Sequence, residues 1–177
     1  MSAVDEFDFG PLAVLIGTWQ GDKGIDIAPD EVEGIEENPY YETIIFTPIG
    51  DATNANRQVP TGLRYHQCVS RKSNDKVFHD ETGYWLWDKA TSTIMHSLVI
   101  PLGMGLLAGG TYMPFAGSSV ITMEVKAGIN NKDWGIVQSP FLRDNASTVA
   151  FQHRISVDGN TLTYDELTIV DIYGKKF

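Results

Sequence analysis

The chain contains about ten short runs of β-branched and aromatic residues, separated by clusters of Gly, Pro, Asn and Asp. Runs bounded in this way are typical of β-strands joined by turns. The predicted strands span residues 17–28, 39–47, 61–72, 76–87, 93–100, 105–112, 118–127, 134–138, 147–157 and 161–173. Because no long helical segments alternate with them, the pattern argues against a parallel sheet with a nucleotide-binding crevice.

The connections between these runs predict how the strands are arranged. Asp158-Gly159 separates two long runs and predicts a hairpin whose turn contains a positive φ angle. An open sheet of about ten strands would expose its edges, so closure is favoured. We therefore predict an all-β fold, an antiparallel up-and-down barrel of about ten strands. One short helix is predicted over residues 10–16, where Pro11 fits the first turn.

Length and charge limit the domain organisation and the partners. The 177 residues suffice for one domain, which we place at residues 10–177 behind an acidic leader at 1–9. The net charge of −10 repels phosphate backbones and anionic lipids, so we expect neither nucleic acid nor a membrane as a partner. The N-terminus lacks the basic and apolar regions of a signal peptide, which predicts a cytoplasmic protein. The sequence is compatible with a monomer and with a homodimer.

Alternation along the strands predicts which side chains line the interior. Successive side chains point to opposite faces of a strand, so each strand offers two candidate linings. One set of faces combines polar and aromatic residues: Tyr65, His79, Glu81, Trp85 and His153. Such a mixed lining favours a barrel that encloses a ligand cavity, whereas the alternative is a solvated sheet face with scattered hydrophobic residues. Met104 lies in a glycine-rich segment that predicts either a flexible apolar lip at the cavity mouth or an ordinary hairpin.

His79 and Glu81 are two residues apart on one strand, so both project from the same face and can share a hydrogen bond. A carboxylate–imidazole pair can orient a base or a metal ligand. The alternative interpretation is a polar network that satisfies buried groups. The acidic residues between positions 22 and 37 lack the spacing of a calcium loop and predict a solvated segment.

Three segments carry a resemblance to a known family. The first strand opens with Gly17-Thr18-Trp19-Gln20-Gly21, and its glycines allow the strand to bend or a ligand to approach the backbone. Together with Phe78-His79-Asp80-Glu81-Thr82-Gly83-Tyr84-Trp85 and with residues 154–164, this segment resembles the nitrobindin family. Nitrobindins are haem-binding calycin relatives with a barrel like those of lipocalins and fatty-acid-binding proteins. Lys23 stands where the family has its third glycine.

The resemblance implies a barrel that holds ferric haem b in an open cleft, with nitric oxide binding and isomerisation of peroxynitrite to nitrate. By the same resemblance, Thr18 lies beside the haem and His79 faces it from the distal side. Trp19 can close one barrel end. The family's proximal histidine follows the last strand, whereas no histidine follows His153 in this chain. His79 is therefore our first candidate for the iron ligand.

Weaker candidates for the axial ligand are His66, His96, His153 and Met104. Three functions follow from these observations. The first is a protein that binds a small hydrophobic ligand, with haem b as the best single candidate. The second is a ferric haem enzyme that isomerises peroxynitrite. The third is a haem-free carrier of a lipid or small apolar metabolite, which would bind a fatty-acid carboxylate through Arg64, Arg154 or Tyr164.

Overall fold

A computed structural model of the chain describes residues 7–29 and 34–177, so positions 1–6 of the predicted leader lie outside the described residues. Two short helices accompany the strands, η1 (Gly10–Leu15, 3-10) and α2 (Pro140–Asn145). The strands are β1 (Gly17–Pro29), β2 (Ile35–Asp51), β3 (Thr61–Arg71), β4 (Val77–Asp88), β5 (Thr93–Ile100), β6 (Met104–Thr111), β7 (Ile121–Gly128), β8 (Ile136–Gln138), β9 (Ala146–Asp158), β10 (Thr161–Ile172) and β11 (Lys175–Lys176).

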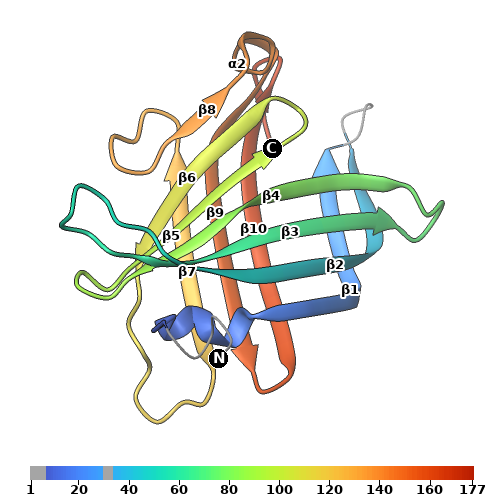
Figure 1. Cartoon of the computed structure of the whole chain (residues 1–177). Coiled ribbons are helices and arrows are strands. Elements are labelled where there is room, and N and C mark those ends of the chain that lie inside the picture. The colour runs from blue at the N-terminus through green and yellow to red at the C-terminus, as the bar shows by residue number, and fades with distance from the viewer. Residues whose placement is uncertain (1–6, 30–33) are drawn as a thin grey trace.

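These strands form one antiparallel sheet that curls into a half-barrel (Figure 1). The order of hydrogen-bonded neighbours is β1-β2-β3-β4-β5-β6-β7-β9-β10-β11, and β8 pairs with β6. The predicted all-β antiparallel architecture is therefore confirmed. A side-chain contact joins the second strand from each edge of the sheet, because the Tyr40 hydroxyl of β2 lies 2.8 Å from the Tyr164 hydroxyl of β10.

The predicted turns and bends have clear local causes. Gly159 adopts a φ of 56° in the β9–β10 hairpin, as its Asp-Gly sequence predicts. The β1–β2 register shifts between Gly21 and Gly24. A Cβ atom at residue 24 would overlap the ring of Tyr40, so glycine admits that ring against the backbone. The sequence did not predict α2, which Ser139 caps by accepting a hydrogen bond from the Leu142 N–H.

Helix η1 closes one end of the half-barrel. Its Leu12 and Leu15 side chains are fully buried, and burial of a leucine contributes about 1.5–3 kcal/mol. Trp19 also lies at this end and donates its indole N–H to the Leu15 carbonyl over 2.7 Å. Trp85 and Leu63 are buried in the same core cluster as these two leucines. This half of the interior is therefore packed solid, and only the other half is left for a ligand.

Among the described residues, no helix is both long enough and apolar enough to cross a membrane.

Candidate functional site

The open half of the interior contains a cleft made of two adjoining chambers. The outer chamber has a volume of about 550 Å³ and the inner chamber about 340 Å³. Both volumes fall within the usual range for small-molecule sites. The chambers share four lining residues, Asp26, His79, Glu166 and Thr168, which we call the waist. Strands β1, β4 and β10 contribute them, so the waist joins strands that are distant in the sequence.

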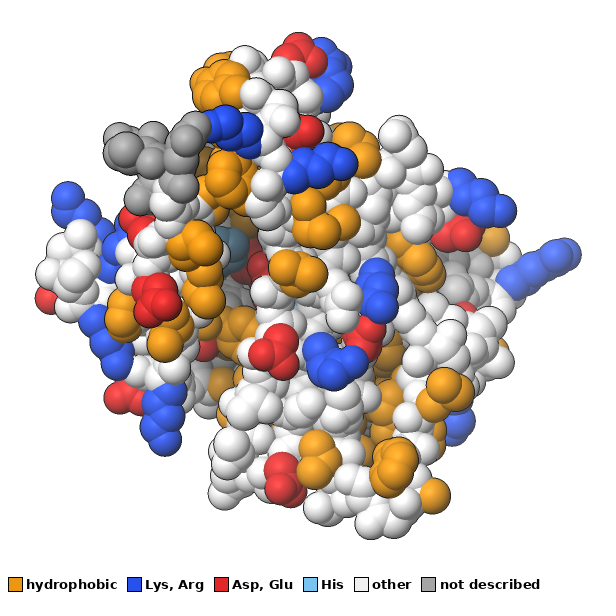
Figure 2. Space-filling model, turned by 180° about the vertical axis from the view of Figure 1, so that it is seen from behind, with side chains coloured by type: hydrophobic (Ala, Val, Ile, Leu, Met, Phe, Trp, Pro, Cys, Tyr) orange, Lys and Arg blue, Asp and Glu red, His pale blue; other side chains and the backbone are white. Residues whose placement is uncertain are grey.

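The inner chamber has mainly apolar walls, whereas apolar and polar side chains line the outer chamber in similar measure. The inner chamber is lined by Leu98, Ile100, Leu102, Met104, Leu142, Phe151, Val170 and Ile172. Beyond the waist, the outer chamber is lined by the apolar residues Ile25, Ile27, Val69, Phe78 and Leu167 and by the polar residues Tyr40, Gln67, Tyr164 and Asp165. Figure 2 shows a hollow on this side of the molecule, where histidine and acidic side chains are visible between hydrophobic ones. The cleft thus suits a ligand with a broad apolar body and a polar centre.

His79 is linked to a buried hydrogen-bond chain beneath the cleft. Its Nε2 atom lies 3.0 Å from Oε2 of Glu81, a residue that is only 2% exposed. The other carboxylate oxygen, Oε1, accepts a 2.7 Å hydrogen bond from the Tyr65 hydroxyl. That hydroxyl lies 2.8 Å from Nε2 of His96, which is fully buried. We call these four residues the relay.

The two imidazoles of the relay have opposite pKa shifts. Burial lowers the pKa of His79, but the hydrogen bond and charge of Glu81, together with the charges of Glu166 and Asp26, outweigh burial and raise it above its ordinary value. Burial and the neighbouring His153 lower the pKa of His96 to about 3. His96 is therefore neutral at physiological pH, whereas His79 can accept a proton near neutral pH.

A second polar cluster lies beside the outer chamber. The Tyr164 hydroxyl donates to Oε2 of Glu42 over 2.9 Å, and Gln67 donates to the same oxygen over 2.8 Å. Burial raises the pKa of Glu42 despite these hydrogen bonds. The Tyr164 ring stacks on His153 with ring centroids 5.3 Å apart, and His153 Nδ1 lies 3.1 Å from Glu166 Oε2. Tyr164 is thus already committed to protein partners.

The structure brings only some of the predicted site residues into the cleft. His79, Glu81 and Met104 line it. Tyr65, Trp85 and His153 lie beneath it with exposures of 3%, 1% and 4%, around a void of about 10 Å³.

The remaining candidates lie elsewhere. Thr18 is exposed on β1, and Trp19 packs against η1, so neither belongs to the cleft lining given by the described residues. His66 pairs with Asp80 at 3.1 Å, where both side chains are about half exposed. Arg64 and Arg154 are also exposed, and Arg154 pairs with Glu124.

The sequence reasoning missed the waist residues other than His79. Glu166 and Thr168 follow Tyr164 at alternate positions of β10, so all three share one face. The sequence alone could therefore have predicted that Glu166 and Thr168 point to the same side of the sheet as Tyr164. Asp26 was considered only as part of a solvated acidic segment. Its position in the waist depends on the curl of the sheet, which brings β1 toward β10.

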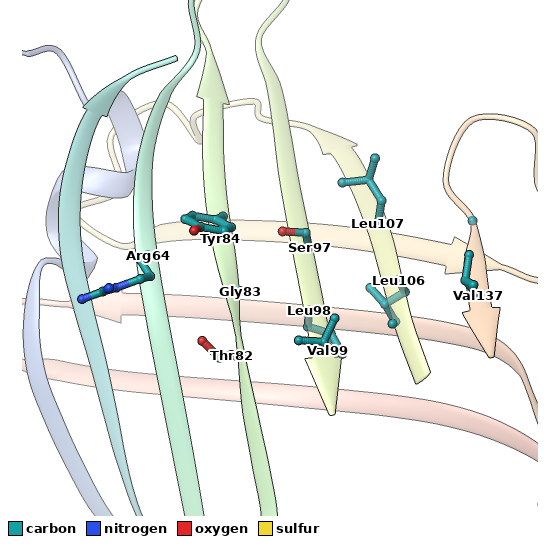
Figure 3. Close-up of a pocket in the computed structure, with 12 residues that line it drawn as sticks. Arg64, Thr82, Gly83, Tyr84, Ser97, Leu98, Val99, Leu106, Leu107 and Val137 are labelled. Carbon is teal, nitrogen blue, oxygen red and sulfur yellow. The ribbon is translucent and has the colours of Figure 1, made fainter. Parts of the chain in front are cut away.

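A separate hollow of about 550 Å³ lies on the outer face of the sheet, over β4, β5, β6 and β8 (Figure 3). Val99, Leu107 and Val137 line it, together with Tyr84 and Arg64. Among the described residues, its lining includes neither a histidine nor a carboxylate. This outer groove therefore lacks the paired acid and imidazole groups of the cleft, and the cleft is the candidate functional site.

In the part of the chain that the structure describes, protein side chains alone do not form a multidentate metal site. Within residues 7–29 and 34–177, no group of three or more His, Cys, Asp or Glu side chains could hold a metal ion. A metal in the cleft would therefore need ligands from outside the protein, as a porphyrin supplies.

Comparisons with known proteins agree with the β-barrel fold. A family model described as "THAP4-like, heme-binding beta-barrel domain" matches residues 8–175. The crystal structure of Rv2717c from M. tuberculosis is similar with a TM-score of 0.64 and 21% sequence identity, covering 99% of this chain and 90% of that chain. At this identity, the structural similarity supports the fold alone. No curated protein matched the sequence.

Proposed function

The chain belongs to the THAP4-like, haem-binding β-barrel domain family, the nitrobindin family, and on this basis we propose that it binds haem b in the cleft between β1, β4 and β10. The observation that carries this proposal is the position of His79. Of the four histidines, all of which the structure describes, His66 is exposed on the outer face and His96 and His153 are buried. Only His79 lines the cleft.

The residues of the cleft fit the chemical requirements of a haem. The apolar wall of the inner chamber and the apolar side chains of the outer chamber would hold the macrocycle, and His79 would supply an axial nitrogen. Metal-bound histidines usually donate their other ring N–H to a carboxylate, and Glu81 lies 3.0 Å from Nε2 of His79. When bound, a ferric haem would supply a centre that can take nitric oxide or a similar small ligand.

The charges around the waist favour haem over a fatty acid. Asp26, Glu81 and Glu166 surround His79, and the described lining of the cleft includes no lysine or arginine. Such a field stabilises a positive centre, such as ferric iron beside His79, and repels any carboxylate at the waist. A fatty-acid head group is therefore disfavoured there, and the propionates of a haem would have to lie away from the waist. Of the three predicted partners of a fatty-acid carboxylate, Arg64 and Arg154 are exposed and do not line the cleft. The third, Tyr164, lines the outer chamber but donates its hydroxyl to Glu42. Isomerisation of peroxynitrite stays a prediction of the family resemblance.

Titration of hemin into the purified protein tests the proposal. We expect a saturable, shifted Soret band with the wild type and with His66→Ala, which removes an exposed imidazole from the outer face. His79→Ala should weaken binding at least about tenfold and change the band, because the axial nitrogen is lost. Metal-free protoporphyrin IX should bind the wild type and His79→Ala equally. The proposal is wrong if the wild type gives no saturable band, or if His79→Ala matches it.

A further inference from the structure

The relay contains a buried carboxylate whose two oxygens each have one close partner. Glu81 is 2% exposed, with the Tyr65 hydroxyl 2.7 Å from Oε1 and His79 Nε2 3.0 Å from Oε2. An ionised carboxylate accepts hydrogen bonds and donates none. The Tyr65 hydroxyl donates to Oε1, and the carboxylate form of Glu81 can interact with His79 Nε2 only as an acceptor, so both neighbours then donate to it.

The positions of the other protons follow from this requirement. Burial and the adjacent Glu81 raise the pKa of Tyr65 well above its ordinary value, so its phenol keeps its proton and donates it to Glu81. The Tyr65 oxygen can then accept a hydrogen bond from His96 Nε2, 2.8 Å away. Because His96 is neutral, it must carry its single ring proton on Nε2. All hydrogen bonds of the relay thus point toward Glu81.

We propose that Tyr65 and His96 are positioning residues which, through Glu81, hold neutral His79 with its proton on Nε2, so that Nδ1 is the nitrogen presented to a ligand. A hydrogen bond on one ring nitrogen generally decides which nitrogen is free for a metal. The binding of a ligand to Nδ1 rests on the proposed function. The proton positions are independent of the proposed function, because they are properties of the ligand-free protein.

Other charged groups around His79 affect its protonation without a hydrogen bond to its ring. Asp26 of β1 and Glu166 of β10 raise its pKa by their charges, and Glu42 of β2 also interacts with it through charge. Among the described contacts, Glu81 is the hydrogen-bond partner of the ring. Removing a surrounding charge should therefore change how readily His79 takes up a proton, whereas changing Glu81 should also move the proton between the ring nitrogens.

Nitrogen-15 NMR of the histidine rings in the ligand-free protein tests the proposal. At a pH where His79 is neutral, the wild type should show the Nε2–H form for both His79 and His96. In Glu81→Gln, the amide N–H₂ can donate to Nε2 of His79, and this should move the ring proton to Nδ1 and lower the pKa of His79. Glu166→Gln removes the same charge from the same cleft, and it should lower that pKa while leaving the proton on Nε2.

A second pair of variants tests the role of Tyr65. Tyr65→Phe removes a hydrogen bond from the Glu81 carboxylate, which then attracts the proton of His79 more strongly, so the pKa of His79 should rise. Tyr40→Phe removes a hydroxyl that bonds to Tyr164 instead and should leave this pKa nearer to that of the wild type. If the Tyr65 side chain only filled space, Tyr65→Phe and Tyr40→Phe would not differ in the pKa of His79.

The proposal is overturned by an Nδ1–H form of His79 in the wild type, by retention of Nε2–H in Glu81→Gln, or by equal titrations of Tyr65→Phe and Tyr40→Phe. A hemin titration of Glu81→Gln provides the link to function. We expect about 10–100-fold weaker binding, the usual loss when the hydrogen-bond partner of a metal-bound histidine is changed. If the wild type binds no hemin, the proposed function fails, and the NMR result still decides the proton positions.

Discussion

The two halves of the barrel interior have opposite designs, although strand β4 runs through both. Near its end, β4 places Trp85 in the core cluster that also contains Leu12 and Leu15 of η1, and this residue is 1% exposed. Six residues earlier on the same face, His79 has 32% of its side chain exposed to the cleft. The two side chains differ in exposure because η1 covers the half of the interior that contains Trp85, whereas the half that contains His79 is open to solvent through the cleft. One strand face can therefore supply both a core and a site.

The two imidazoles of the relay show the same contrast in their chemistry. His96 and His79 are joined through Tyr65 and Glu81, yet their pKa values shift in opposite directions. In the packed half, burial dominates and holds His96 neutral. In the cleft, the carboxylates outweigh burial and favour protonated His79. A shared hydrogen-bond chain thus does not equalise its ends, because each ring responds to its own surroundings.

The largest expected effect distinguishes packing in the two halves. Trp85→Ala should lower the free energy of unfolding by about 3–5 kcal/mol, because it leaves a cavity in a filled core. Met104→Ala removes a partly buried side chain from the cleft wall, so we expect a loss of about 1 kcal/mol or less. Urea denaturation of both variants measures the difference. Equal losses would mean that the two halves are packed alike.

An intermediate effect concerns the acid sensitivity of the packed half. The pKa of His96 is about 3 in the folded protein, against about 6.5 in the unfolded chain, so the unfolded state binds more protons between these values. Stability should therefore fall as the pH drops through this window. Between pH 6.5 and 4.5, the wild type should lose about 2 kcal/mol more than His96→Gln, which does not titrate.

Urea denaturation of the wild type and His96→Gln at a series of pH values measures this difference. Glutamine retains an N–H that can donate to Tyr65, so the variant keeps a hydrogen-bond donor in the relay. A wild type and variant with parallel pH dependences would show that His96 does not stay neutral in the folded protein, and the contrast between the two imidazoles would be lost.

Much of the fold was predictable because it depends on local patterns. The strand runs and the Asp158-Gly159 hairpin follow from alternation and turn chemistry, which act over a few residues. The start of β2 was missed because residues 35–38 are mostly polar and pair with the end of β1 at an exposed position. The helix α2 was missed because it is a single short segment whose signal is the Ser139-Pro140 start.

The site was less predictable because it depends on long-range geometry. Alternation gave two candidate faces for each strand, and only the curl of the sheet and the position of η1 determine which face is interior. The same alternation correctly grouped His79 and Glu81 but could not separate the filled half from the cleft. Tyr65 and Trp85 were therefore expected to line the ligand cavity, whereas they lie beneath the cleft. Asp26 enters the waist from a distant strand.

The smallest expected effect tests the opposite pH dependence of the cleft. Because the folded pKa of His79 is raised, its protonated form stabilises the folded state below the unfolded pKa of about 6.5, and this contribution is lost as the pH rises through the folded pKa. The side chain is partly exposed, so we expect an effect of less than about 1 kcal/mol.

Urea denaturation of His79→Gln between pH 5 and 9 measures this effect, with His66→Gln as the control for an exposed imidazole. The difference in free energy of unfolding between the wild type and His79→Gln should become smaller as the pH rises. The difference between the wild type and His96→Gln should become larger as the pH rises through the acidic range. If both differences in the free energy of unfolding changed in the same direction with pH, the two ends of the relay would have the same electrostatic environment. The proposed distinction between the packed half and the cleft would then be wrong.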